Sequence, residues 1–137
     1  MSYVFGMKFL AQMHHPEAEE WLSLIKATLL VALEAHRKQR AIISFGGYLR
    51  AGGEIVLVGH PEILPPTAGI TSWIEQELQR CRQDAIVTII YADIRYKNTP
   101  ALQLRLESAR QEPIELIYQI NPPKMIGMTA GRRAIWS

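Results

Sequence analysis

The sequence lacks the features that mark a disulfide-bonded or membrane-spanning protein. Its single cysteine, Cys81, excludes an intramolecular disulfide and a zinc site built from cysteines. Its most apolar run, residues 28–33, is far shorter than the roughly 20 residues that a spanning helix needs. Residues 1–8 contain no charged stretch followed by a long apolar run. We therefore expect no signal peptide, no membrane association and a cytoplasmic location.

An excess of charge of one sign is also lacking. The chain has 15 Lys and Arg against 13 Asp and Glu, a net charge of +2. Proteins that bind nucleic acids usually concentrate basic residues on one face, so this balance does not predict nucleic-acid binding. The glycine signatures of phosphate-binding loops and the Gly-x-Ser-x-Gly elbow are absent as well. We predict no cofactor.

What the chain does have is the size and composition of one globular domain. With 137 residues, of which 48% are apolar, it can bury a core without covalent cross-links. Strand-like and helical patterns continue without a linker as far as residue 123. We predict a single domain at residues 1–123 and a basic, extended tail at residues 124–137.

The order of the predicted elements is the most informative feature. Residues 16–37 have helical periodicity, with glutamates in the first turn and basic residues in the last, which complements the helix dipole. Ser72 and Glu75 have the spacing of a capping box at the start of a second helix. The remaining predicted elements are an edge strand or covering arm at residues 3–12, strands at 41–48 and 54–59, the second helix at 72–82, and strands at 85–96, 102–107 and 114–120.

This order, (β)-α-β-β-α-β-β-β, predicts an α+β fold. A single antiparallel or mixed sheet of five to six strands carries the packed helices. The order is similar to that of the roadblock and longin type of two-layer sandwich, in which subunits pair through their helices. The resemblance implies a small homodimeric scaffold or regulatory module without catalytic activity.

The first helix is apolar around more of its circumference than one packing face needs. Trp21, Leu24 and Val31 lie in a stripe beside the main apolar stripe. Either other elements of the same domain cover this second stripe, or a second subunit does. We predict a homodimer in which these three residues contact the partner.

The tail is the second predicted contact surface. Lys124, Arg132, Arg133 and Trp136 have no role in a helix end or a strand, so we predict that they bind a protein partner. Binding of DNA or RNA by this basic tail is a further interpretation, and it would weaken steeply with salt.

An enzyme is the alternative class of function. Asp93, Arg95 and Lys97 alternate along one strand and share a face, and His60 follows another strand. Such groups occur in metal-dependent hydrolases and nucleic-acid-processing enzymes, where a carboxylate holds the ion and a lysine stabilises developing charge. His60, Asp93 and Lys97 would be catalytic. The Glu-x-Lys element of such sites is absent, and a cross-strand salt bridge explains the same residues. We therefore favour a non-enzymatic interaction module without a metal site.

Overall fold

The computed structural model describes residues 18–39, 44–59 and 69–136. The predicted strand or arm at residues 3–12 and His60 lie outside these residues. Within them, no helix is long and apolar enough to cross a membrane. The elements are α2 (Ala18–Gln39), β1 (Ser44–Arg50), β2 (Ile55–Val58), α3 (Ile70–Cys81), β3 (Ala85–Tyr96), β4 (Thr99–Ser108), β5 (Ile114–Gln119) and β6 (Lys124–Ala130).

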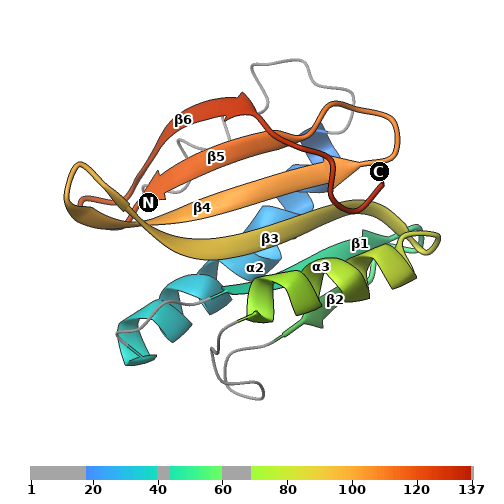
Figure 1. The fold of residues 1–137 in the computed structure, drawn as a ribbon, viewed down its shortest axis with the longest axis horizontal. Coiled ribbons are helices and arrows are strands. Elements are labelled where there is room, and N and C mark those ends of the chain that lie inside the picture. Colours follow the sequence, from blue (N-terminus) through green and yellow to red (C-terminus); the bar gives the residue numbers. More distant parts are fainter. Residues whose placement is uncertain (1–17, 40–43, 60–68, 137) are drawn as a thin grey trace.

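The six strands form one sheet in the order β2-β1-β3-β4-β5-β6 (Figure 1). Every neighbouring pair is antiparallel. Lys97 and Asn98 both have positive φ in the tight turn between β3 and β4, as a two-residue hairpin requires. The predicted α+β class, the antiparallel sheet and the order of elements from the first helix to β5 are confirmed.

The helices pack on opposite faces of the sheet. A Cβ atom at Gly46 would lie 2.9 Å from Ile74 of α3, and one at Gly47 would lie 3.8 Å from Thr28 of α2. Successive residues of a strand point to opposite faces, so the two helices lie on opposite sides. Figure 1 shows α3 in front of the sheet and α2 behind it. The two-layer arrangement that the roadblock and longin resemblance implies is not confirmed.

The main core lies between α2 and the sheet. Alternate residues of the central strands point into it, so that Leu104 is fully buried while the neighbouring Arg105 points to the other face. The Thr28 hydroxyl satisfies its hydrogen bonds inside the core, with the Leu24 carbonyl at 2.7 Å and the Tyr91 hydroxyl at 2.7 Å. The largest fully buried side chains are Trp21, Tyr91, Tyr118, Phe45, Leu24, Ile25, Leu29, Ile74, Leu78 and Ile89.

Helix α3 covers only part of the other face. Its buried residues Ile74 and Leu78 pack over β1, where glycine allows close approach. The predicted capping box is wrong: the N-cap is Gly69, in the left-handed region with φ 84, and no side chain caps the helix. The hydroxyl of Thr71 instead pairs with that of Ser44 at 2.9 Å. Tertiary contact with β1 therefore determines how this helix begins.

The predicted boundary at residue 123 falls inside the sheet. Residues 124–130 form β6 and pair with β5 along its length. Beyond β6 the chain turns back, and Ile135 is only 2% exposed within the core. The sequence pattern of β6 is weak because the strand contains Gly127 and meets a register shift at Ile117/Tyr118. Pairing with β5, and not a hydrophobic periodicity in its own sequence, therefore identifies β6 as a strand.

Candidate functional site

The apolar stripe of α2 does not form an exposed surface. Trp21 and Leu24 are both 0% exposed within the core of the same chain, and Val31 is half-buried against it. The helix has 22 residues and lies against β1, β2 and β3, so the sheet uses a broad arc of its circumference. Of its outward-facing residues, Leu30 is 60% exposed. Trp21 and Leu24 therefore offer no surface to a second subunit.

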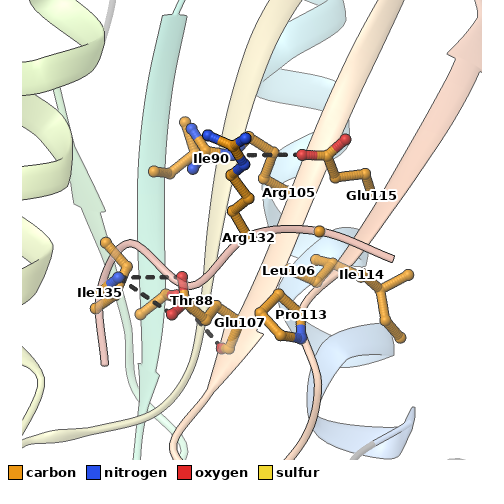
Figure 2. A pocket seen from close by; sticks show the side chains of 11 residues that line it. Thr88, Ile90, Arg105, Leu106, Glu107, Pro113, Ile114, Glu115, Arg132 and Ile135 are labelled. Carbon is orange, nitrogen blue, oxygen red and sulfur yellow. Dashed lines mark hydrogen bonds and ion pairs between the residues drawn. The ribbon is translucent and has the colours of Figure 1, made fainter. Parts of the chain in front are cut away.

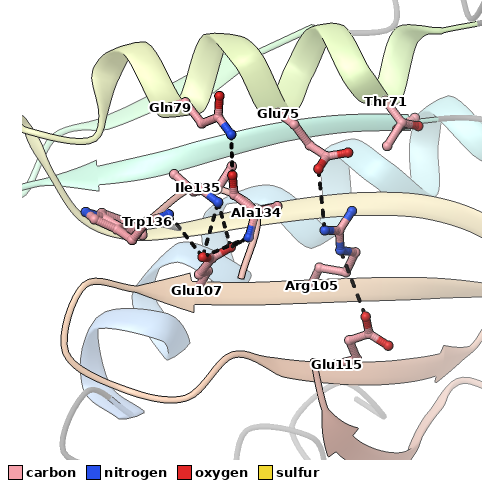
Figure 3. Close-up of polar contacts among 10 residues, drawn as sticks. Thr71, Glu75, Gln79, Arg105, Glu107, Glu115, Ala134, Ile135 and Trp136 are labelled. Carbon is pink, nitrogen blue, oxygen red and sulfur yellow. Dashed lines mark hydrogen bonds and ion pairs between the residues drawn. The ribbon is translucent and has the colours of Figure 1, made fainter. Parts of the chain in front are cut away.

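The C-terminal segment is held on the sheet by a buried carboxylate. Glu107 of β4 accepts hydrogen bonds from the backbone N–H groups of Ala134, Ile135 and Trp136 at 3.0–3.1 Å (Figure 3). The side-chain amide of Gln79 on α3 donates to the Ala134 carbonyl. Three successive N–H groups stabilise the charge of a buried carboxylate, because hydrogen bonds to an ion are roughly twice as strong as those between neutral groups. We call this arrangement the C-terminal clasp.

The four predicted contact residues of this region have separate environments. Arg133 is used inside the domain, where it donates to the Ser108 carbonyl at 2.9 Å and the Gln111 carbonyl at 2.8 Å. Lys124 is exposed at the start of β6, and Arg132 is exposed beside Arg105 (Figure 2). Trp136 is half-buried beyond the clasp. The residues therefore do not form one basic surface.

The space beneath the C-terminal segment is nearly filled. The cavity drawn in Figure 2 lies between this segment and strands β3, β4 and β5, and measures about 10 Å³. A water molecule needs about 10–15 Å³ measured in this way. The cavity therefore has room for one water molecule and not for a ligand.

A second polar group joins α3 to the sheet. The guanidinium of Arg105 lies 3.7 Å from the carboxylate of Glu75 and 4.0 Å from that of Glu115 (Figure 3). Gln103 also donates to Glu115 at 3.3 Å. The Arg105 guanidinium on β4 therefore links a carboxylate of α3 with one of β5, and these three charged groups pair with one another.

Of the residues in the enzyme alternative, the structure describes Asp93, Arg95 and Lys97, and each has a separate local contact. Asp93 pairs with Nδ1 of His36 on α2 at 3.0 Å, across 57 positions of the sequence. Arg95 donates to the Asn98 carbonyl at 2.5 Å. Lys97 lies in the turn with its Nζ 5.4 Å from the centre of the Tyr96 ring. In the part of the chain that the structure describes, no three His, Cys, Asp or Glu side chains are arranged to hold a metal ion.

The His36–Asp93 pair was missed from the sequence for a physical reason. His36 lies in the last turn of α2, where a basic residue also suits the helix dipole, so its position has a local explanation. The pairing arises because α2 crosses the face that carries the alternate residues of β3. No short-range spacing predicts such a contact.

Among the described residues, no strand pairs with the outer side of β2, which is an edge of the sheet. The N–H of Arg50 donates to the Glu54 carbonyl at 2.8 Å, which identifies these two residues as a hydrogen-bonded pair of the β1–β2 ladder. Such pairs alternate with non-bonded ones in antiparallel sheets, so Val56 and Val58 also bond to β1. Ile55 and Leu57 then direct their N–H and C=O groups away from β1, toward the outer edge.

Apolar side chains flank this edge on both faces. Leu57 is 36% exposed on the α2 face, where it lies opposite Gly47. On the α3 face, Val58 is partly buried, and the indole of Trp73 lies against Gly59 and is 42% exposed. The strand Ile55–Val58 contains no charge and no proline.

The opposite edge of the sheet is protected in the usual ways. Strand β6 begins with a lysine and has a register shift against β5. Charges and bulges are common devices that prevent edge strands from pairing with other chains. Strand β2 has an unbroken register with β1 and no charge, and only its short length limits pairing. Among the described residues it is the exposed edge most suited to accept another strand.

Comparison with known proteins identifies no relative. No protein-family model, curated protein or solved structure matches the chain. The described residues define the class: a small α+β domain whose six strands form one antiparallel sheet, with the apolar strand β2 at one edge and β6 at the other.

Proposed function

We propose that this protein is a non-enzymatic interaction module that binds an extended, apolar segment of a partner protein along β2. The partner segment adds a strand to the sheet, a mode known as β-augmentation. The observation that supports this most directly is the open backbone of Ile55 and Leu57 on a strand without charge, proline or bulge.

Backbone hydrogen bonds supply the affinity. Ile55 and Leu57 each present one donor and one acceptor, and each bond contributes about 0.5–1.5 kcal/mol net of water. The geometry of the strand is already set by β1, so binding does not need to order it.

Side chains supply the selectivity. Alternate residues of an added strand point to opposite faces of the sheet. One set would contact Leu57 on the α2 face, and the other would contact Val58 and the indole of Trp73. A segment with apolar residues on both faces would bury these exposed groups, whereas a charged residue opposite them would lose its hydration.

The size of the edge favours a short partner segment over a second copy of this chain. Stable protein–protein interfaces bury about 1,200–2,000 Å² in total. The four-residue strand Ile55–Val58, with Leu57 and Trp73 as its exposed large apolar side chains, offers much less. A segment of a few residues needs no larger surface, because most of its affinity comes from the backbone.

The test removes one edge-facing N–H without touching the β1 ladder. Proline at position 57 deletes the N–H that points outward, and prolines are tolerated on such edges. We expect apolar ten-residue peptides, selected from a random library on the full chain, to bind in the micromolar range. Leu57→Pro should weaken their binding by roughly two- to tenfold, the loss of one backbone hydrogen bond. Leu57→Ala keeps the N–H and should weaken peptide binding less than Leu57→Pro does.

Two further variants distinguish strand pairing at β2 from nonspecific hydrophobic binding. Leu30→Lys changes an exposed leucine on α2, away from the edge, and should leave peptide binding unchanged. If the Leu57→Pro variant does not fold, Leu57→Lys tests the same edge with a substitution that the fold tolerates more readily. It should also weaken peptide binding. Peptides that bind wild type, Leu57→Pro and Leu57→Lys equally would contradict the proposal.

Sedimentation of the wild type tests whether a second copy of the chain, and not a segment of a partner protein, occupies β2. A monomer at 100 μM supports capture of a partner segment. A dimer that disappears in Leu57→Pro would show that a second copy of the chain occupies β2, and would overturn the proposal of a partner segment.

A further inference from the structure

The fold gathers positive charge at one end of the sheet. Three segments meet there: the last turns of α2 (34–38), the β3–β4 turn with the adjoining strand ends (93–100) and the β5–β6 turn (120–124). They contain five Lys and Arg against two acidic residues, whereas the other described residues contain eight against nine. We call the five exposed cations the basic end: Arg37, Lys38, Arg95, Lys97 and Lys124.

A contact between distant residues brings α2 to this end of the sheet. Asp93 of β3 pairs with His36 of α2 at 3.0 Å, which places the neighbouring Arg37 and Lys38 beside the end of the strand. The Asp93 side chain is only 11% exposed, so its charge is directed inward. The other acid, Glu34, lies 2.6 Å from Arg37 and 3.5 Å from Lys38 and offsets part of their charge. The surplus of positive charge therefore faces solvent.

The cations form a row across the ends of the strands. Lys124, at the start of β6, is three strands away from Ile94 of β3 through the paired ladders of β4 and β5. Neighbouring strands lie about 4.8 Å apart, so this separation is about 14 Å. The major groove of B-DNA is roughly 12 Å wide, so the two ends of the row can reach phosphates on both sides of one groove. Figure 1 shows both turns and the end of α2 toward the left.

The aromatic side chain at the basic end is not placed for base stacking. Tyr96 is half-buried, and Nζ of Lys97 lies 5.4 Å from the centre of its ring. Proteins that bind single strands stack the bases on accessible aromatic rings. A duplex keeps its bases stacked inside and presents two rows of phosphates, which lysine and arginine contact without reading the sequence. The basic end therefore fits a duplex better than a single strand.

An anionic membrane fits this surface less well. Protein segments that bind a membrane surface bury apolar side chains beside their basic ones. The exposed large apolar side chains of the described residues are Leu30, Leu57 and Trp73, which lie outside the three segments. Among the described residues, the basic end thus offers charge without an exposed large apolar side chain.

From these features we propose that the basic end binds the phosphate backbone of a nucleic-acid duplex without sequence preference. The surface differs from the basic tail considered from the sequence, because it shares only Lys124 with that tail and includes neither Arg132 nor Arg133. It also lies at the ends of the strands and not along the β2 edge. The proposal therefore does not depend on the function proposed for β2.

Fluorescence anisotropy of the full chain with a labelled 20-base-pair DNA duplex tests the proposal. Each phosphate that a cation neutralises contributes about −0.9 to the slope of log affinity against log salt concentration. With four to five cations in contact we expect a slope of about −4, and a Kd below about 100 μM at 50 mM salt. No change in anisotropy with 100 μM protein at 50 mM salt would overturn the proposal.

Two double variants with the same loss of charge locate the contact. Lys97→Gln with Lys124→Gln should reduce the magnitude of the salt slope by about two, since each lysine that contacts a phosphate accounts for about one. Lys26→Gln with Arg110→Gln removes two exposed cations outside the three segments and should leave the slope unchanged. Equal changes in the two double variants would mean attraction to the charge of the whole molecule and would contradict the proposal.

Other polyanions test the class of partner. A single strand of the same length, a polyglutamate peptide and vesicles with 30% phosphatidylserine should each bind more weakly than the duplex at 50 mM salt. Tighter binding of the single strand or of polyglutamate would overturn the assignment of a duplex. Binding to vesicles that is tighter than binding to the duplex, and that is lost in Lys97→Gln with Lys124→Gln, would identify a membrane surface as the partner and would also overturn it.

Discussion

At the scale of the residue, Gly46 shows how one missing side chain allows two layers to meet. A Cβ atom there would lie 2.8 Å from the Ile89 carbonyl oxygen and 2.9 Å from a methyl of Ile74. The first neighbour is backbone of β3 and cannot rotate away. The register of β1 against β3 is regular through Gly46 and Gly47, so Gly46 marks a close approach between layers and not a bulge.

We therefore expect Gly46→Ala to destabilise the protein by about 1–3 kcal/mol, the usual cost of overpacking a tight contact. Gly127→Ala is the matched control, because a Cβ there meets nothing within 4 Å. It should change the free energy of unfolding by less than about 1 kcal/mol. Urea denaturation of both variants measures the difference. Equal stabilities would show that α3 can move away from β1 without loss.

At the scale of the element, the C-terminal segment is part of the domain. The clasp joins it to β4, Gln79 joins it to α3, and Ile135 fills a position in the core. Its backbone N–H groups belong to no helix or strand, and Glu107 satisfies three of them in succession. A carboxylate that is 5% exposed is stable there because of these donors.

Glu107→Gln should loosen this segment. The amide keeps one acceptor, but its NH₂ group faces backbone donors, and the charge assistance is lost. We expect a loss of about 1.5–3 kcal/mol, the range for hydrogen bonds to charged groups. Hydrogen exchange at Ala134, Ile135 and Trp136 should accelerate more than elsewhere.

Glu112→Gln, in the exposed turn before β5, is the matched control and should leave exchange and stability unchanged. Unchanged exchange at residues 134–136 in Glu107→Gln would mean that the other contacts, which are the packing of Ile135 and the bonds of Gln79 and Arg133, hold the segment without the carboxylate.

At the scale of the whole molecule, a buried hydroxyl pair joins α2 to the centre of the sheet. Thr28 and Tyr91 share a hydrogen bond of 2.7 Å, and the Tyr91 ring stacks on Phe45 with centroids 4.9 Å apart. Burial raises the pKa of Tyr91, although the hydrogen bond with Thr28 opposes the shift. Burial also raises the pKa of Tyr48. Both groups favour the neutral form in the folded state.

The sign of the pH dependence follows from these shifts. Below the pKa of an unfolded tyrosine, about 10, the ring is neutral in both states and its stabilisation is fully present. Above it the unfolded chain releases the proton first, so stability falls as pH rises toward the folded pKa. The slope is about 1.4 kcal/mol per pH unit for each such group.

Tyr91→Phe removes one of these groups. We expect its free energy of unfolding, measured in urea between pH 9 and 11.5, to fall less steeply above pH 10 than that of the wild type. Its stability at pH 8 should be lower, because the hydrogen bond to Thr28 is lost. Identical slopes in Tyr91→Phe and wild type would show that Tyr91 does not titrate with unfolding.

The fold was more predictable from the sequence than the sites were. Alternation along Leu102, Leu104 and Leu106 predicted β4 because a sheet with one covered face repeats every two residues. Candidate sites needed contacts between distant residues: His36 with Asp93, and Glu107 with residues 134–136. Neither pair has a spacing that local periodicity can detect.

The sequence by itself determined the helices, the strands through β5 and the antiparallel class, because these depend on hydrophobic periodicity and turn residues along the chain. Only the tertiary structure decided that Trp21 and Leu24 lie in the chain's own core, that the tail forms β6 and the clasp, and that β2 is an open edge. The physical reason is that burial and strand neighbours depend on which surfaces meet in space. Burial of an apolar side chain is equally favourable against the chain's own sheet and against a partner protein. The hydrophobic pattern in the sequence is therefore the same in both cases.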